Sequence, residues 1–316
     1  YHGKTHGALS LSESVTGDQE FIMGIPKENI ITVPYGDINA IRHAIKNETN
    51  KSGINPIVAT IIEPIQGQGV NTPPRGYLDE VIKVCHENNI LVVFDEIKTG
   101  MGRTGKFCSF MWDQVVPDVV TISKALGGGK RAISSFTTTE KIFNRAYGNR
   151  KDAGLHTTTF GGLGQSCAVG IEALNILLDE KLIENAHEKG EYLSKKLNLL
   201  KNKYQNKIKN INGKGLFWGI QLKYDEWTTR NIAKNINSKF TKNLDSLLIA
   251  SIVREILEEH NIILHFTPSN IDTLHIMPPL LVEYEHIDKL FEALDSIFSL
   301  NFAQMISKFL KKIVLK

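Results

Sequence analysis

Three ionisable residues, Glu63, Asp95 and Lys124, each follow a short apolar run of the sequence. Runs of this kind are typical of buried parallel strands, and parallel sheets place their chemistry just beyond the carboxyl ends of their strands. A lysine in a closed site can lose its proton and attack an aldehyde. A carboxylate on a neighbouring strand can keep the ring nitrogen of an electron-withdrawing cofactor protonated. Asp95 and Lys124 are therefore candidates for a single amine-transferring site.

The elements that must position these residues are strands expected over 57–62, 90–94 and 119–122, with a helix over 77–88 between the first two. The helix is indicated by apolar residues at helical spacing. A strand–helix–strand order with continuously apolar strands predicts an α/β fold with a parallel sheet covered on both faces. Packing alone explains the strands, but it does not explain why an ionisable residue stands at the end of each.

The second half of the chain mixes helices and strands. Its expected elements are helices over 166–179, 182–200, 247–260 and 284–299, and strands over 213–222, 262–266 and 273–277. This pattern favours a smaller α+β domain after a long connecting helix, so we expect a large domain over 1–205 and a small domain over 206–316. The tail 300–316 has the pattern of an amphipathic basic helix that packs or lies exposed.

Composition narrows the function classes. The chain has 316 residues, 41% of them hydrophobic and 22% charged, and a net charge of +3, which does not favour nucleic-acid binding. The Lys- and Asn-rich segment 196–214 is interpreted as a solvated face. Three cysteines without C-x-x-C spacing support neither a disulfide frame nor a metal site, and they favour a cytoplasmic location. No apolar run approaches the ~20 residues of a membrane helix.

The segment Gly100–Gly105 fits G-x-G-x-x-G and, with Lys106, nearly fits a phosphate-binding loop. Phe107 stands where such a loop requires Ser or Thr. No helix pattern opens after the glycines before Pro117, so a nucleotide site is disfavoured here.

Five motifs in a fixed order carry a family resemblance. They are Tyr1-His-Gly-Lys-Thr, Phe94-Asp-Glu-Ile-Lys-Thr-Gly-Met-Gly-Arg-Thr-Gly with the later Pro117-Asp, Ser123-Lys-Ala-Leu-Gly-Gly-Gly, His156-Thr-Thr-Thr-Phe-Gly-Gly, and Ile276-Met-Pro-Pro-Leu. With them the chain resembles the class III (ω-type) pyridoxal-phosphate aminotransferases over nearly its whole length. The stretch 262–282 resembles most the diamine branch, of putrescine and ornithine type. The resemblance implies a pyridoxal-phosphate transferase of fold type I.

The resemblance assigns roles around the cofactor, pyridoxal 5'-phosphate. Lys124 would hold it as an imine and later move a proton between substrate and cofactor. Asp95 would pair with the pyridine nitrogen. Ile97 and Tyr1 would pack on opposite faces of the ring, and His2 would belong to the same cofactor-binding set.

The resemblance also implies a homodimer with a shared active site, because Thr158 or, preferably, Thr159 would donate to the cofactor phosphate across a two-fold interface. Without the resemblance, Thr157–Thr159 would be interpreted as a Ser/Thr-rich turn. His156 is interpreted as a hydrogen-bonded turn residue rather than a catalytic one.

The partners implied are an amino donor and a 2-oxo acid acceptor, with Glu63 and His275 on the substrate side. Two positions depart from the family. Lys98 stands where the family usually has a glutamine that contacts the ring oxygen, and it could contact that oxygen as a cation or turn to solvent. His275 stands where an arginine often clamps a carboxylate, and imidazole cannot form that fork. We therefore hypothesise a donor without an α-carboxylate, or weak oxo-acid binding.

Two alternatives remain open at this stage. One is another pyridoxal-phosphate reaction on the same fold, such as that of an aminomutase. The other is a catalytically silent homologue, because the chain opens at Tyr1 within a patterned segment whereas the family carries a substantial segment before this point, including a helix start that grips the phosphate. We therefore expect the sequence to be an N-terminally truncated fragment.

Overall fold

The computed structural model describes residues 1–3, 5–12, 24–155, 158–223, 238–267, 270–301, 303–305 and 307–308, with the side chains of residues 6, 52 and 238–244 not described. It divides into two compact units. Unit 1 comprises Tyr1–Gly67 and Thr72–Glu184, and unit 2 comprises Gln68–Asn71 and Asn185–Lys316.

The division falls at Glu184, whereas the sequence places the domain boundary near residue 205. The physical reason lies in helix α6 (Leu182–Lys203), whose apolar stripe, including Leu193, Leu197 and Leu200, is buried in the core of unit 2. The helix was expected to connect the domains, but it packs as part of the second one.

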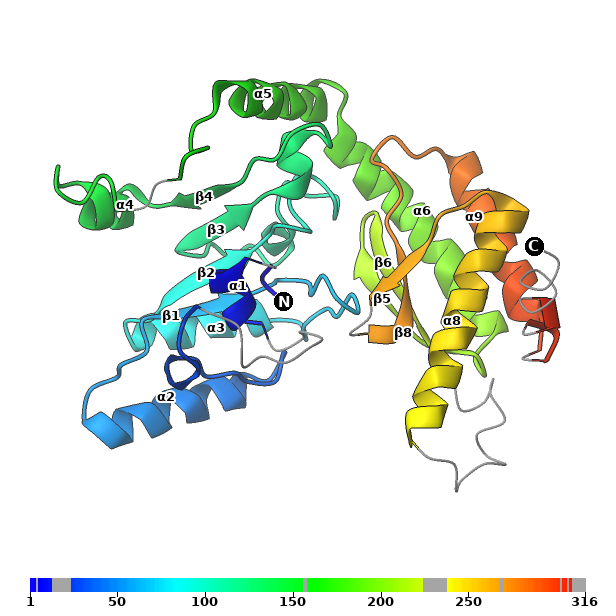
Figure 1. The fold of residues 1–316 in the computed structure, drawn as a ribbon, viewed down its shortest axis with the longest axis horizontal. Coiled ribbons are helices and arrows are strands. Elements are labelled where there is room, and N and C mark those ends of the chain that lie inside the picture. Colours follow the sequence, from blue (N-terminus) through cyan, green and yellow to red (C-terminus); the bar gives the residue numbers. More distant parts are fainter. Residues whose placement is uncertain are drawn as a thin grey trace. The chain divides into compact units, whose positions relative to one another are not determined.

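Unit 1 contains a four-stranded sheet in the order β1 (Ala59–Ile62), β2 (Leu91–Asp95), β3 (Val119–Ile122) and β4 (Ser135–Thr138) (Figure 1). The first three strands are parallel, as predicted. Strand β4, which the sequence analysis did not foresee, is antiparallel to β3. A short connection can join antiparallel neighbours, whereas a parallel pair needs a crossover.

The strand register brings the predicted residues to one edge of this sheet. Ile62 is opposite Phe94, so Glu63 follows β1 at the level of Asp95, and Asp95 in turn is opposite Thr121. Lys124 comes three residues after Thr121 and begins the 3-10 helix η4 (Lys124–Gly127). The carboxyl ends of three parallel strands thus carry all three residues.

Helix α3 (Tyr77–Glu87) packs against β2 and connects β1 to it (Figure 1). Its buried face includes Leu78, Val81, Val84 and Cys85 at helical spacing. Helix α2 (Ile38–Ser52) packs on α3 and begins at Asp37, whose carboxylate accepts from two backbone N–H groups of the first turn. The part of unit 1 that the structure describes also contains helices α1 (His6–Ser10), α4 (Glu140–Tyr147) and α5 (Gly164–Asp179) and the 3-10 helices η2 (Lys27–Asn29) and η3 (Ser109–Trp112).

Helix α5 supports the element that carries Lys124. Small residues allow the close packing, because a Cβ on Gly128 would lie 3.4 Å from Cβ of Ala173, and a Cβ on Gly170 would lie 3.5 Å from the carbonyl oxygen of Leu126. The buried face of α5 therefore rests directly on η4 and the glycines after it. The opposite face carries Ile171 and Leu178, both exposed and two turns apart.

In its described residues, unit 2 is an antiparallel sheet packed with helices. Its strand order is β5 (Ile208–Lys214), β6 (Phe217–Leu222), β8 (Asn270–Ile276) and β7 (His265–Thr267), and its helices are α6, α8 (Ser238–His260) and α9 (Tyr284–Ser299). The prediction of one strand over 213–222 was wrong, because a turn at Gly215 (φ 56°) splits this segment into the β5–β6 hairpin. Within the described residues, no helix is long and apolar enough to span a bilayer.

A buried carboxylate fixes the turn that follows β2. Glu96 is 0% exposed and accepts hydrogen bonds from Ser109 Oγ at 2.7 Å, from the N–H of Phe110 at 2.9 Å and from Thr99 Oγ1 at 2.5 Å. Thr99 and Ser109, which flank the glycine-rich segment 100–105, both donate to this carboxylate, and the short η3 begins at Ser109. This arrangement leaves no helix start there to receive a phosphate.

Burial raises the pKa of Glu96, while its three donors oppose that rise. A carboxyl group whose folded pKa is raised stabilises the protein below its unfolded pKa and loses that contribution as pH rises through the folded value. We expect the free energy of unfolding to decline above about pH 5, and Glu96→Gln to flatten the decline. Urea unfolding between pH 5 and pH 8 measures this effect. The exposed Glu87→Gln on α3 is the control, and an unchanged slope in Glu96→Gln would contradict the prediction.

Candidate active site

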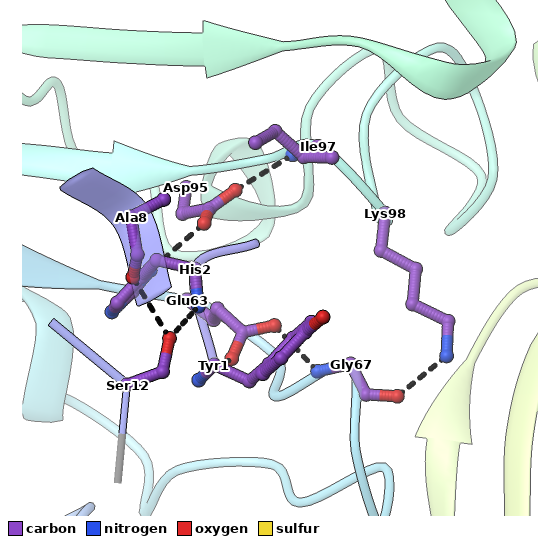
Figure 2. Close-up of polar contacts among 9 residues, drawn as sticks. All are labelled: Tyr1, His2, Ala8, Ser12, Glu63, Gly67, Asp95, Ile97 and Lys98. Carbon is purple, nitrogen blue, oxygen red and sulfur yellow. Dashed lines mark hydrogen bonds and ion pairs between the residues drawn. The ribbon is translucent and has the colours of Figure 1, made fainter. Parts of the chain in front are cut away.

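Asp95 is held at both of its carboxylate oxygens at the end of β2. Oδ1 accepts from the N–H of Ile97 at 3.0 Å, and Oδ2 lies 2.8 Å from Nδ1 of His2 (Figure 2). The Asp95 side chain is only 8% exposed, so these partners compensate for the loss of water. Its orientation is therefore fixed before any ligand binds.

The backbone of His2 is fixed in turn. Its N–H donates to Ser12 Oγ at 2.8 Å, and that hydroxyl donates to the carbonyl of Ala8 in α1 at 3.0 Å. Ser12 is buried. The first residues of the chain thus contribute a support for Asp95 from outside the sheet, as Figure 2 shows.

Glu63 is the second buried carboxylate of the site. Its Oε2 accepts from the N–H of Gly67 at 2.7 Å, and its Oε1 lies 3.1 Å from the backbone nitrogen of Tyr1 (Figure 2). Tyr35 donates its hydroxyl to the carbonyl of Pro64 at 2.9 Å and so supports the same loop. Both Glu63 oxygens are engaged by backbone groups, and its carboxylate is held within the loop after β1.

Lys98 turns inward to the loop after β1. Its Nζ donates to the carbonyl oxygen of Gly67 at 2.5 Å (Figure 2). The sequence left open whether this lysine contacts the site or points to solvent, and the structure places it in the site. Burial, chiefly, and the charge of Lys124 lower the pKa of Lys98 to about 8, while Glu63 acts in the opposite direction.

Lys124 adopts a left-handed backbone conformation with φ of 41°, which is unfavourable for a residue with a side chain. Lys124 is exposed in the chain, but partial desolvation lowers the pKa of its amine, and the negative charges of Asp95 and Glu63 partly offset that effect. The strand register brings Glu63, Asp95 and Lys124 to one sheet edge, and Lys98 packs against Gly67 beside Glu63, so we treat the two carboxylates and two lysines as one cluster. The residues predicted from three separate strand ends are thus brought together.

Other predicted residues belong to other elements of the chain. Thr158 and Thr159 are exposed in a turn, where the Thr158 carbonyl accepts from the N–H of Gly161 at 3.0 Å. His275 lies in unit 2, only 1% exposed on β8 opposite His265, with the two rings 4.8 Å apart. His156 and Thr157, together with most of the tail 300–316, lie outside the described residues.

Ile97 and Tyr1, which were expected to flank a cofactor ring, are both partly exposed next to the cluster. In the structure, the N–H of Ile97 donates to Asp95, and the backbone nitrogen of Tyr1 contacts Glu63. Their packing against a ring stays a prediction.

The sequence analysis missed the supporting residues Ser12, Tyr35 and Gly67. Gly67 alone had a signal, because it closes the Glu63-Pro-Ile-Gln-Gly segment that follows β1. Ser12 and Tyr35 are far from the motifs in sequence and act through single hydroxyl groups, which no spacing pattern indicates.

The cluster can bind an aldehyde through an amine and hold a protonated ring nitrogen with a carboxylate. A metal-based alternative has no support among the described residues, which include no group of three or more His, Cys, Asp or Glu side chains placed to hold an ion.

Comparison with solved structures places this geometry among known enzymes. The chain is similar to ornithine aminotransferase from Plasmodium yoelii, with 30% identity and a TM-score of 0.69 over 85% of this chain and 62% of that one. It is similar to ornithine aminotransferase from Toxoplasma gondii, a structure described with partial occupancy of PLP at the active site, with 28% identity and a TM-score of 0.76 over 97% of this chain and 64% of that one. An S-selective transaminase from Arthrobacter sp. with alanine bound gives 25% identity and a TM-score of 0.78 over 95% and 68%.

The chain therefore spans less than two thirds of both ornithine aminotransferases. These similarities confirm the predicted α/β fold of type I. The sequence also matches the family model described as Aminotransferase class-III over residues 1–298. Because that match extends over almost the whole sequence, this chain belongs to the class III aminotransferases.

Proposed function

We propose that the protein is a pyridoxal-phosphate-dependent transaminase, in which Lys124 is the attachment point of the cofactor and Asp95 the partner of its ring nitrogen. The observation that carries the proposal is the fixed Asp95 carboxylate, held by His2 and by the N–H of Ile97 at the same sheet edge as Lys124, where its negative charge raises the pKa of the Lys124 amine. Class III family membership supports the same reaction class.

The described residues fit this cofactor. Asp95 has a buried carboxylate oxygen beside an imidazole, which suits a charge-assisted bond to a pyridinium N–H. Lys124 carries an amine whose pKa is lowered, which raises the fraction able to attack an aldehyde. Bound pyridoxal phosphate supplies an electron sink for the bonds at the amine-bearing carbon of the substrate.

The residues of the chain do the rest. The Nζ atom of Lys124 would take the proton from the substrate carbon and later deliver it to the cofactor, because its long side chain lets the amine reach both. His2 and Ile97 hold the Asp95 carboxylate in one orientation, so it would need no reorganisation to pair with a protonated ring nitrogen. Glu63, on the loop after β1, lines the substrate side.

For the substrates we propose chemical classes and no individual compounds. We infer a 2-oxo acid acceptor and a donor with a terminal amino group, in line with the ornithine aminotransferases among the similar structures. An imidazole buried at His275 cannot form the two-pronged contact of an arginine with a carboxylate. This supports a donor that does not depend on an α-carboxylate clamp at that position.

A homodimer completes the proposal, because Thr158 and Thr159 then serve the phosphate of the partner's cofactor. Large apolar side chains are exposed around these threonines and along α5, namely Leu155, Phe160, Leu163, Ile171, Ile176 and Leu178. Such a surface supports a second copy of the chain as its cover. A reducing, cytoplasmic location agrees with the three free cysteines.

Removing the amine of Lys124 tests its proposed role as the attachment point of the cofactor. With pyridoxal phosphate added, we expect the visible absorbance band of the lysine-bound cofactor to be absent in Lys124→Ala. Transamination should fall by roughly 100- to 10,000-fold, because the proton-moving group is gone. Lys141→Ala, on α4, is the control and should keep both. A band of equal strength in Lys124→Ala, or no band in the native chain, would exclude the proposed role.

The contact between His2 and Asp95 generates a second prediction. His2→Ala leaves one buried Asp95 oxygen without its imidazole, which should weaken cofactor binding by about 1–2 kcal/mol, or roughly five- to thirty-fold in Kd. Titration of the cofactor band measures the change. His43→Ala, an exposed position on α2, should bind as the native protein does. Equal affinities for the two variants would rule out a positioning role for His2.

The homodimer is tested by a charge on the apolar surface. Phe160 is 76% exposed, so Phe160→Asp leaves the folded unit undisturbed but should shift the chain from dimer to monomer. Sedimentation equilibrium of the two proteins at matched concentrations gives the masses. Val58→Asp, equally exposed before β1, is the matched control. A native chain that is monomeric at tens of micromolar would refute the dimer.

A further inference from the structure

Gly67 is the residue at which the loop after β1 leaves unit 1. The residues from Tyr1 to Gly67 belong to unit 1, and the next four, Gln68–Asn71, belong to unit 2. The loop therefore starts at the candidate site, with Glu63, and continues into a different unit. Contacts that fix Gly67 also fix the end of the short segment that carries Glu63.

The segment Gln68–Asn71 is closely packed within unit 2. Val70 is 0% exposed, and a Cβ on Gly219 of β6 would lie 2.9 Å from the Cβ of Val70. A Cβ on Gly69 would lie 2.2 Å from Nδ2 of Asn270, at the start of β8. This packing ties the segment to the sheet of unit 2, so a displacement of that sheet is passed along the backbone to Gly67.

Two side chains of unit 1 hold Gly67 itself. Its N–H donates to Oε2 of Glu63 at 2.7 Å, and its carbonyl oxygen accepts from Nζ of Lys98 at 2.5 Å (Figure 2). A Cβ on Gly67 would lie 2.8 Å from Cδ of Lys98 and 2.9 Å from Oε2 of Glu63. The lysine stem and the carboxylate therefore lie against the same face of Gly67, where any larger residue would displace them.

The two hydrogen bonds act on adjoining peptide groups. Glu63 is bonded to the peptide that precedes Gly67, and Lys98 is bonded to the peptide that connects Gly67 to Gln68. Because the two peptides meet at the Cα of Gly67, rotation of the second one changes the direction of the first. A charged donor makes the lysine hydrogen bond one of the stronger kind. The amine of Lys98 thus helps to direct the N–H that the Glu63 carboxylate accepts.

We propose that Lys98 is a positioning residue for Glu63, and that it acts by holding the carbonyl of Gly67 at the point where the chain passes into unit 2. A displacement that arrives through Gln68 then meets the Lys98–Gly67 hydrogen bond before it reaches the Glu63 carboxylate. The effect of Lys98 on the reaction rests on the proposed function, in which Glu63 lines the substrate side. The Lys98–Gly67 hydrogen bond is a property of the chain alone.

Residue-resolved hydrogen–deuterium exchange of the full chain tests the hydrogen bond. Lys98→Met keeps an unbranched stem against Gly67 but removes the donor, so the N–H of Gly67 should exchange roughly tenfold faster than in the native protein. Lys98→Gln is a second variant, whose amide ends one atom nearer the backbone, and it should also accelerate the exchange. A Gly67 exchange rate that is unchanged in both variants overturns the proposal.

Lys207 offers the matched control. Its Nζ also donates to backbone carbonyl oxygens, those of Phe298 at 2.6 Å and Leu300 at 2.7 Å, within unit 2. Lys207→Met should leave the Gly67 N–H at its native exchange rate. An acceleration as large as that in Lys98→Met would show that the loss of any such lysine loosens the chain, and it would overturn the proposal. Circular dichroism confirms that each variant is folded.

Kinetics test whether Lys98 acts through Glu63. With 1,4-diaminobutane as the donor and 2-oxoglutarate as the acceptor, Lys98→Met should raise the KM of the donor by roughly fivefold, because the carboxylate that attracts its ammonium group is no longer held in place. In a Glu63→Gln background the same substitution should have little effect on this KM. Equal effects in the two backgrounds would overturn the positioning role.

The two measurements separate this role from the proposed function. If the native chain does not catalyse transamination, the proposed function fails, while the exchange rate of Gly67 still decides whether Lys98 fixes the loop. If transamination occurs and the Gly67 exchange rate is the same in the native chain and the Lys98 variants, the proposed function stands and the positioning role fails.

Discussion

The site depends on one buried carboxylate whose two oxygens are engaged from different directions. The N–H of Ile97 reaches Asp95 along the chain, two residues on, and the imidazole of His2 reaches it from a segment more than ninety residues earlier. A buried carboxylate without such partners would become protonated and lose its charge. The remaining contacts of the cluster are arranged around this fixed negative group.

The parallel strands of unit 1 explain why residues distant in the sequence meet in the cluster. In a parallel register, residues that follow neighbouring strands emerge at the same edge, so Glu63 and Asp95 reach the same edge although they are 32 residues apart in the sequence. Glu96, the residue after Asp95, turns into the core and ties the following loop down with three hydrogen bonds. Of these two adjacent carboxylates, Asp95 faces the candidate site, and Glu96 holds the loop that borders it.

Much of this arrangement could be predicted from the sequence. β-Branched runs indicated β1, β2 and β3, and the ionisable residues at their ends indicated the edge where chemistry occurs. The inward turn of Lys98 could not be predicted, because it depends on the carbonyl direction of Gly67, which no side-chain pattern encodes. The β5–β6 hairpin was missed because 213–222 was taken as one strand, whereas Gly215 lies in the turn between β5 and β6. The unit to which α6 belongs could not be predicted either, because its apolar stripe indicates that the helix is buried but does not indicate in which unit.

Helix α5 connects the backbone at the reactive lysine with the outside of the molecule. On its inner face, Gly170 and Ala173 lie against the turn that holds Lys124 in its left-handed conformation. On its outer face, Ile171 and Leu178 present apolar surface to whatever covers them. In the proposed homodimer, a partner that covers this outer face would limit movement of α5 and of the turn that α5 supports. Assembly of the proposed dimer would then influence Lys124 through α5, without contact between the partner and the lysine.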